Sequence, residues 1–395
     1  DADLTDATVL GQEIGWVKPK GALAHVSGRA VIQGERALRV EDIAFAAGDL
    51  GIEAGVAFDP ATGAVSRVSV RRLQGAGHDL AAEFAFGAQA DDIRIYGRAA
   101  DLRPLLAPGD EATEQDAAAE TPPHPSRIRV DLDKARLTEG LTLARFRADM
   151  TISGDWPSAF TAEGDYPGGA LRIAPDPERR GGFVATASEF GRLLEGLGVT
   201  EIVRGGGLTI QTAPPTEAGV ALDARAGDFD VDKADLARIV GEGSTDLLSV
   251  FDGGDRINFD RLLAKAVYKE GVIQIEAAQA GGAGLGVSAE GVVDLAQRTI
   301  DVRGAIAPAY GFSRVIGGIP ILGDLLAGSK KEGVFAATYR ATGDLDDPAV
   351  EVNGLSALAP GIIREALEGA PPGEPKRNGE KADPSDQYDY DRNSD

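Results

Sequence analysis

The sequence predicts a mostly β protein made of many short strands in a largely antiparallel arrangement. Apolar and polar residues alternate with period two in one segment after another, and turn residues recur about every ten positions, as in a β-meander. The chain has 52 Gly and 21 Pro among 395 residues, a composition that suits strands joined by turns. Aromatic residues make up only 6% of the chain, so an apolar strand face has to be mainly aliphatic.

Residues 1–106 are predicted to form a first β-sheet section. Val68 and Val70 alternate with Arg67, Ser69 and Arg71, which gives that strand one apolar and one polar face. The strands of this section are expected at residues 30–33, 38–43, 51–58, 65–73, 80–86 and 93–96.

Residues 107–125 read APGDEATEQDAAAETPPHP. This stretch has few apolar groups beyond alanine, so it cannot bury enough surface to offset the entropy lost on ordering the chain. We therefore predict a flexible linker here, and it is the clearest internal boundary of the sequence.

Residues 126–306 are predicted to resume the sheet. The alternation is clearest in two strands, whose apolar side chains are Ile128, Val130 and Leu132, and Phe146, Met150 and Ile152. Further strands are expected at residues 160–164, 170–173, 182–186, 207–212, 220–226, 272–277, 284–295 and 299–306. Because successive side chains of a strand point to opposite faces, the apolar residues of each strand share one face of the sheet.

Short helices are predicted at intervals along this sheet. Residues 188–197 have an apolar stripe at helical spacing, with Ser188 as the N-cap. Residues 232–240 and 259–266 are two further candidates. No repeat of fixed length is strong enough to indicate a solenoid.

Residues 307–370 are predicted to form a separate C-terminal end. Residues 312–327 are apolar, but Pro320 and Asp324 interrupt them, which favours two short amphipathic segments over one membrane-spanning helix. A hairpin is expected over residues 334–352, with its turn at 344–348, and a second apolar helix over 355–367. Residues 371–395 are predicted to be a disordered tail.

The charge and cysteine content of the chain exclude several classes of function. A formal net charge of −23 argues against nucleic-acid binding, because phosphate binding needs a concentrated basic surface. A chain without Cys has no disulfides or thiolate nucleophiles, and it is well suited to an oxidising periplasm. The sequence begins at Asp1, without a Met or a signal peptide, which suggests a fragment or processed product whose membrane anchor lies upstream.

No group of residues indicates catalysis, a metal or a cofactor. His25, His78 and His124 lie far apart, and each is interpreted as an ordinary surface or turn residue. The sequence GGAGLG at 281–286 follows a strand but precedes another strand, so it is interpreted as a hairpin turn and not as a phosphate-binding loop. The acidic residues at 344–347 lack the spacing of a calcium loop. The sequence therefore predicts a protein that is not an enzyme, without cofactor or metal.

The pattern of apolar strand faces leaves two architectures open. They can form the sealed core of ordinary β-sandwiches, or they can line an open or half-closed sheet. The apolar segments at the C-terminal end leave a similar choice, since they can cap the sheet or contact a membrane or a partner protein.

Four motifs near the C-terminus carry a resemblance to a known family. They are P-A-Y from Pro308, I-P-x-L-G-D-x-L-x-G from Ile319, G-x-F-A-A-T-Y-R from Gly333 and V-N-x-L-S-A-L-A-P-G from Val352. Weaker matches lie upstream, at residues 3–7, 15–19, 101–106 and 204–209. The chain resembles the AsmA-like superfamily, in particular the C-terminal part of the YhdP-type bacterial envelope proteins. Gly354 departs from the pattern, where the family is expected to carry Pro.

This resemblance implies an extended, twisted sheet curled into a hydrophobic groove, with short rim helices. It also implies a bridge-like lipid transfer or lipid-homeostasis protein that shields phospholipid acyl chains across the periplasm, between inner and outer membranes. The full-length protein is expected to be periplasmic and anchored in the inner membrane. A non-enzymatic envelope scaffold or outer-membrane assembly factor is the alternative, and an envelope hydrolase is a remote third.

Two sets of residues are then expected to act. The lipid-groove set, defined by apolar positions on the predicted strands, is Ile128, Val130, Leu132, Phe146, Met150, Ile152, Leu208, Ile210, Val220, Leu222, Ile273, Ile275, Ile300 and Val302. The membrane or partner contacts, defined by apolar positions at the C-terminal end, are Ile319, Ile321, Leu322, Leu325, Leu326, Leu358, Ile362 and Ile363.

Overall fold

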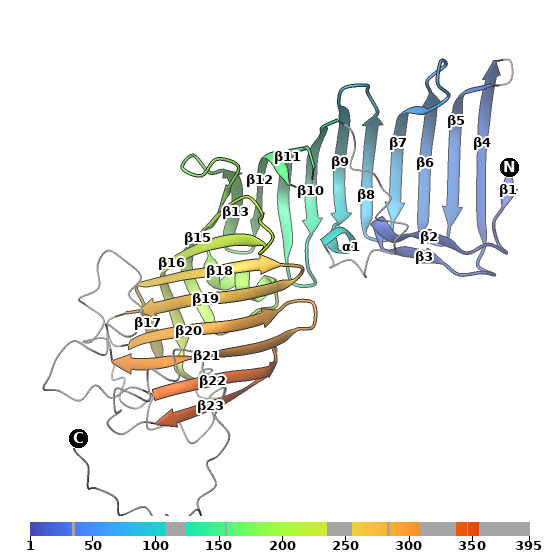
Figure 1. Ribbon diagram of the computed structural model, residues 1–395. Coiled ribbons are helices and arrows are strands. Elements are labelled where there is room, and N and C mark those ends of the chain that lie inside the picture. The colour runs from blue at the N-terminus through green and yellow to red at the C-terminus, as the bar shows by residue number, and fades with distance from the viewer. Residues whose placement is uncertain are drawn as a thin grey trace, which may run out of the picture.

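One large, curled and unclosed β-sheet accounts for most of the structure (Figure 1). This computed structural model describes residues 1–33, 36–106, 124–154, 156–234, 255–282, 285–308, 337–345 and 347–354. Across these ranges the sheet has 21 strands, and nearly all neighbours pair antiparallel in chain order. The predicted mostly β, largely antiparallel fold is therefore confirmed.

The first part of the sheet is a meander that starts at the N-terminus. Its strands are β1 (Ala2–Asp3), β4 (Ala24–Gln33), β5 (Arg36–Ala47), β6 (Leu50–Phe58), β7 (Val65–Gly75), β8 (His78–Ala85) and β9 (Asp91–Asp101). The short strand β1 pairs with only the first residues of β4, which places this end of the sheet at β1 and β4.

The second part of the sheet continues the meander and curls. Its strands are β10 (Ser126–Arg136), β11 (Thr142–Ile152), β12 (Pro157–Tyr166), β13 (Gly169–Pro175), β14 (Phe183–Ala187), β15 (Val203–Thr212), β16 (Val220–Asp232), β17 (Arg256–Phe259), β18 (Arg261–Lys269), β19 (Val272–Gly281), β20 (Leu285–Asp294), β21 (Thr299–Pro308), β22 (Ala337–Asp344) and β23 (Pro348–Gly354). Both β17 and β18 pair with β16, at different parts of its length.

A parallel pair joins the two parts. Strand β10 lies beside β9 in parallel register, from Ser126 opposite Asp91 to Arg136 opposite Asp101. A parallel pair needs a long connection that returns to the start of the next strand. Here that connection includes the predicted linker 107–125, most of which lies outside the described residues.

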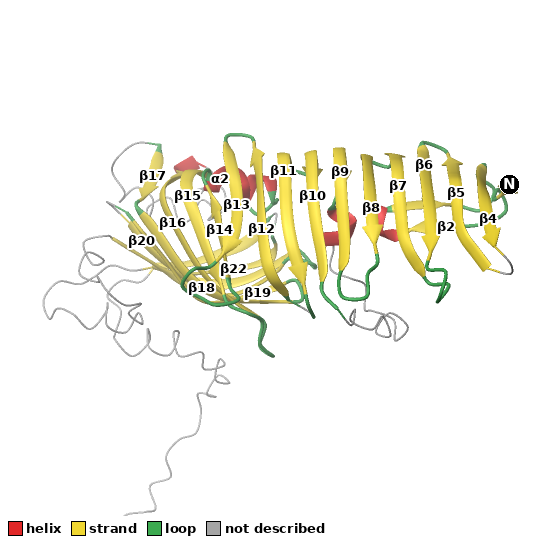
Figure 2. Ribbon diagram, turned by 90° about the horizontal axis from the view of Figure 1, so that it is seen from above, coloured by secondary structure: helices red, strands yellow, loops and turns green. Residues whose placement is uncertain are grey.

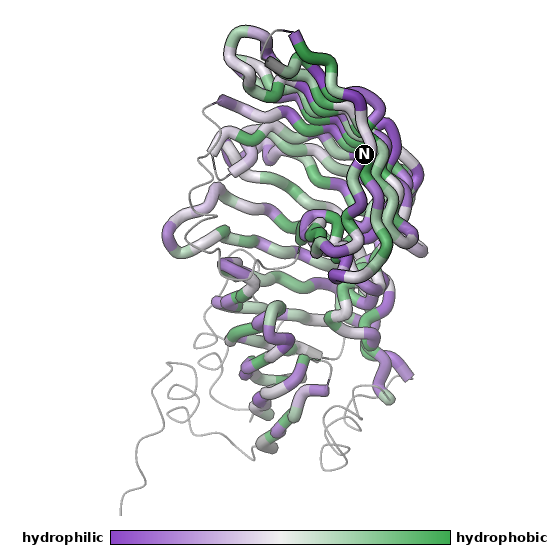
Figure 3. Tube along the Cα trace, turned by 90° about the vertical axis from the view of Figure 1, so that its right-hand side faces the viewer, coloured by the Kyte–Doolittle hydropathy of each residue, from purple (hydrophilic) through white to green (hydrophobic). Residues whose placement is uncertain are grey.

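The strand registers place the apolar side chains on one face of the sheet, called here the apolar face. Directly paired residues point to the same side, so pairing can be followed from strand to strand. One unbroken line of such pairs, the central row, consists of Ile43, Ala54, Val70, Ala82, Ile95, Val130, Ala148, Ala162, Ile173, Ala185, Ile210, Ala224, Ala264, Ala278 and Ala289. At about 4.8 Å per strand, this row extends over roughly 65 Å. The alternation of hydrophobic and hydrophilic residues along several strands is visible in Figure 3.

The opposite face carries ion pairs between neighbouring strands and is called here the charged face. Arg129 lies 3.0 Å from Asp92 and 3.7 Å from Asp149, so it bridges three strands. Further along the sheet, Arg340 lies 2.9 Å from Asp301. Each exposed pair adds little stability, but such a row keeps this face of the sheet in water.

Small elements cover part of the apolar face, and they lie on the same side of the sheet (Figure 2). At the N-terminal part these are β2 (Val9–Gly11), the 3₁₀ turn η1 (Gln12–Ile14), β3 (Trp16–Lys18) and α1 (Arg103–Leu106). Trp16 packs edge-on against Phe45 of the sheet, with ring centroids 5.8 Å apart. In the C-terminal part the cover is α2 (Phe190–Gly196).

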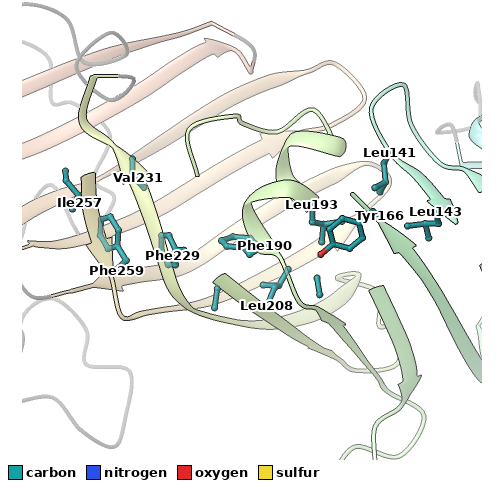
Figure 4. Packing of buried hydrophobic residues seen from close by; sticks show 12 residues of the cluster. Leu141, Leu143, Tyr166, Phe190, Leu193, Leu208, Phe229, Val231, Ile257 and Phe259 are labelled. Atoms are coloured by element: carbon teal, nitrogen blue, oxygen red, sulfur yellow. The ribbon is translucent and has the colours of Figure 1, made fainter. Parts of the chain in front are cut away.

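The main hydrophobic core lies between α2 and the curled sheet (Figure 4). Phe190 and Leu193 of α2 are buried against it, and Leu143 of β11 is fully buried. The ring of Phe229 stacks on Phe259 at a centroid distance of 5.1 Å and meets Phe190 edge-on at 5.8 Å. Side chains from strands as far along the chain as Ile306 also pack on this cluster, because the sheet curls around α2.

The hairpin predictions are confirmed. Gly281 pairs with Gly286 across the turn between β19 and β20, so this glycine-rich stretch joins two strands. Gly343 pairs with Pro348 where β22 turns into β23. The C-terminal segments at 312–327 and 355–367, and the tail from 371, lie outside the described residues.

Three local predictions are wrong or need correction. Residues 261–266 belong to strand β18 and not to a helix, because Leu262 and Ala264 face the apolar side while Arg261, Leu263 and Lys265 face the other. Helix α2 exists, but Ser188 is not its N-cap, since its Oγ accepts a hydrogen bond from the N–H of Ala170 in the next strand. His78 flanks the turn between β7 and β8, which fits one part of its interpretation as a surface or turn residue, but it is buried, with 6% of its surface exposed. The candidate helix at 232–240 lies mostly outside the described residues.

Candidate functional site

The predicted groove residues lie on a single face of the sheet. Ile128 pairs with Met150, Val130 with Ala148, and Leu132 with Phe146, and the register carries the same face to the later strands. The other members of the set on this face are Ile152, Leu208, Ile210, Val220, Leu222, Ile273, Ile275, Ile300 and Val302. The eight predicted contact residues of the C-terminal end lie outside the described residues.

Protein contacts cover some of these residues and leave others accessible. Leu132 is 1% exposed, Leu208 9% and Val302 6%, so each is packed against other parts of the chain. Ile128 and Met150 are only half-buried. The apolar face therefore has a covered section around α2 and a more accessible section over the earlier strands.

The accessible section includes a second line of paired apolar residues, the outer row. It is parallel to the central row, and each of its members is half-buried: Val40, Val56, Val68, Phe84, Ile93, Ile128, Met150 and Phe160. Sequence reasoning proposed only Ile128 and Met150 of this row as site residues. The alternation at Val68 and Val70 was the available signal for the earlier strands.

An aromatic cluster bounds the accessible section at β12–β14. Phe160 at the end of the outer row meets Phe183 edge-on, with ring centroids 5.9 Å apart, and Trp156 lies 5.6 Å from Phe183. The indole N–H of Trp156 donates to the carbonyl of Gly181 at 2.9 Å, which fixes the loop between β13 and β14. Beyond this cluster the apolar face is filled by the α2 core.

The electrostatics divide between the two faces. Neither the central row nor the outer row contains a charged side chain, whereas the charged face carries carboxylates held by arginines. The hydrogen bonds from Arg340 lower the pKa of Asp301. Near α1, hydrogen bonds from Arg103 likewise lower the pKa of Asp101. These carboxylates stabilise the sheet and do not approach the apolar rows.

Tyr339 supplies a side-chain hydrogen bond where the backbone pairing between β20 and β21 is interrupted. It lies directly across from Gly304, and its hydroxyl donates to the carbonyl of Ser288 at 2.8 Å. A Cβ on Gly304 would lie only 1.8 Å from that carbonyl oxygen, so glycine is required beside the ring. Burial raises the pKa of Tyr339 to about 12.

This raised pKa predicts a loss of stability at high pH. The folded state favours the neutral phenol, so the stabilisation is complete below the ordinary pKa of about 10 and is lost as the pH rises towards about 12. The free energy of unfolding is expected to fall more steeply between pH 10 and 12 in the parent chain than in Tyr339→Phe. Urea unfolding across this range measures both slopes, and parallel curves would contradict the assignment.

Neither a metal centre nor a spanning helix is found in the described part of the chain. No group of His, Asp and Glu side chains in these ranges is placed to hold a metal ion. No helix among these residues has the length and apolarity needed to cross a membrane. His78 has its Nε2 3.4 Å from the carbonyl of Ile14, a contact within the cover of the apolar face.

Comparison of the chain with protein-family models, curated proteins and solved structures found no match.

Proposed function

We propose that this chain shields phospholipid acyl chains from water on the accessible section of its apolar face. The observation that carries the proposal is the outer row beside the central row, both apolar and free of charge over many strands. Each methylene that moves from water onto such a surface gains about 0.8 kcal/mol. A sheet with this surface holds an acyl chain without any bond being made or broken, so the proposal includes no catalysis.

The resemblance to the AsmA-like superfamily suggests where in the cell this binding acts. The proposed protein is a bridge-like lipid transfer or lipid-homeostasis protein of the periplasm, acting between inner and outer membranes. In the full-length protein, an upstream anchor holds it at the inner membrane. The C-terminal end contacts a membrane or an envelope protein, and the accessible face forms a hydrophobic groove.

A specific observation favours the alternative, a non-enzymatic envelope scaffold or outer-membrane assembly factor. The covered section around α2 is packed as a core, with Leu143 fully buried and Phe229 4% exposed. A sealed core of this kind has no room for a ligand and serves only to hold the sheet. The proposal therefore places lipid on the earlier strands, where the rows are half-buried.

Adjacent residues on opposite faces provide the test. A photo-crosslinking residue at Ile128, on the outer row, is expected to capture phospholipid during expression in a bacterial envelope. The same residue at Arg127 is the matched control, because Arg127 is exposed on the charged face one position away. Mass spectrometry of the adducts identifies the lipid, and equal capture at both positions, or at neither, would contradict the proposal.

A further inference from the structure

A hollow of about 430 Å³ lies on the charged face, over β13–β16. Ala170 and Arg172 line it, whereas Leu171, which points to the apolar face between them, does not. Ala187 and Leu208 also line it, but their side chains are buried in the core that α2 forms on the apolar side of this part of the sheet. The hollow is therefore separate from the rows to which lipid binding is assigned.

Among the described residues, an arginine without a carboxylate partner lies in this hollow. Arg147, on the same face two strands away, lies 3.6 Å from Asp131 and 3.9 Å from Glu163. Arg172 is directly across from Glu163 in the register but makes no ion pair within 4.0 Å in the described ranges. Its guanidinium, with five N–H donors, is thus available to an external acceptor.

Hydroxyl groups continue the line of donors from Arg172. The register pairs Arg172 with Thr186 and Thr186 with Thr209, so the three lie side by side on neighbouring strands. Within the described residues, the hydroxyls of both threonines lack a hydrogen-bond partner. Ser188 accepts a hydrogen bond at its Oγ from the N–H of Ala170, which leaves its own proton free to donate.

The hollow also has room for a ligand group. Gly207 lies on its floor, and a Cβ built there meets no atom within 4 Å. A second hollow of about 630 Å³ adjoins it towards β9, and Arg172 lines both. Members of the central row also line this second hollow: Ile95, Val130, Ala148, Ala162 and Ile173.

We propose that Arg172, with the hydroxyls of Thr186, Ser188 and Thr209, binds a small oxyanion, a phosphate or a carboxylate group. A guanidinium forms paired hydrogen bonds with such a group, and the hydroxyls satisfy its remaining oxygens. Asp228 also lines the hollow, and its negative charge opposes the bound anion. Because of this repulsion we expect the anion to bind weakly, with a Kd on the order of 1 mM.

Titration of the 395-residue chain at low ionic strength tests the proposal, with inorganic phosphate and succinate as probes and calorimetry as the measurement. Arg172→Gln is expected to weaken binding at least tenfold. Arg303→Gln is the matched control, since it removes the same charge from the same face at a residue paired 2.8 Å from Glu290, outside the hollow. Binding of both probes at more than about 20 mM only, or equal loss in the two variants, would overturn the proposal.

Asp228→Asn gives a test in the opposite direction. Asp228 has a positive φ of 55°, a conformation that asparagine tolerates well, so this variant keeps the fold and removes the repulsive charge. It is expected to bind phosphate about three- to tenfold more tightly. Unchanged or weaker binding would show that the anion does not occupy this hollow.

A second experiment, with lipid vesicles, distinguishes a phosphate in a lipid headgroup from a phosphate in solution. Vesicles containing phosphatidic acid are compared with vesicles of phosphatidylcholine alone, with the parent chain and Arg172→Gln. Arg172-dependent binding to the first vesicles assigns the phosphate to a lipid headgroup, and binding of free phosphate alone assigns it to a soluble anion. Because the hollow lies on the charged face, loss of this site leaves lipid capture at Ile128 unchanged, so the two proposals fail independently.

Discussion

Replacing Phe229 with alanine is expected to lower the free energy of unfolding by about 3–5 kcal/mol. Phe229 is 4% exposed and lies between the rings of Phe190 and Phe259. Removing its ring leaves a cavity between α2 and the sheet that neither neighbour can fill without moving the backbone. Urea unfolding followed by circular dichroism measures this change.

Phe86→Ala is the matched control for this prediction. Phe86 is 44% exposed just after the end of β8, so the same truncation there removes few contacts, and its cost is expected to stay below about 1 kcal/mol. Similar costs at the two positions would show that α2 does not seal the sheet. The covered section would then be open to ligand as well.

Ile128→Asp is expected to abolish lipid binding while the protein stays folded. Ile128 is half-buried on the outer row, so water reaches a carboxylate there and the loss of stability stays on the order of 1 kcal/mol. An acyl chain that binds on the outer row, however, would have to desolvate the carboxylate, which opposes binding. Native mass spectrometry of bound lipid, beside thermal melting, measures both effects.

Val302→Asp makes the same change at a covered position of the same face. Val302 is 6% exposed, so an aspartate at this position has no access to water. The loss of stability is expected to reach several kcal/mol. This variant should unfold or fail to accumulate. A normal melt with normal lipid occupancy in Ile128→Asp would contradict lipid contact on the outer row.

Alternation in the sequence was enough to predict most strands and the two faces of the sheet. Ile128, Val130 and Leu132 were placed on one face because side chains of a strand alternate strictly, and this geometry is local. The same argument failed at residues 259–266, where Leu262 and Leu263 are both apolar and mimic a helical stripe. These residues form a strand because they pair with β16 and β19, and this pairing leaves Leu263 on the charged face, 38% exposed.

The candidate site was only partly predictable, because accessibility depends on what packs on a face. Leu132, Ile128 and Val302 have the same kind of sequence environment. Leu132 and Val302 are nevertheless buried, with 1% and 6% of their surface exposed, whereas Ile128 is only half-buried. Nothing local indicates that α2 folds back over Leu208, or that Trp16 of β3 packs on Phe45. These contacts join segments far apart in the chain.

A β-sheet with one aliphatic and one charged face can be predicted from the residues alone, since period-two patterning acts within each strand. Three features follow from the fold alone: which part of the aliphatic face is sealed, the parallel pairing of β9 with β10, and the position of Arg172 beside Thr186. The reason is physical: strand order, curl and cross-strand neighbours are set by contacts between distant segments, and these leave no periodic signal along the chain.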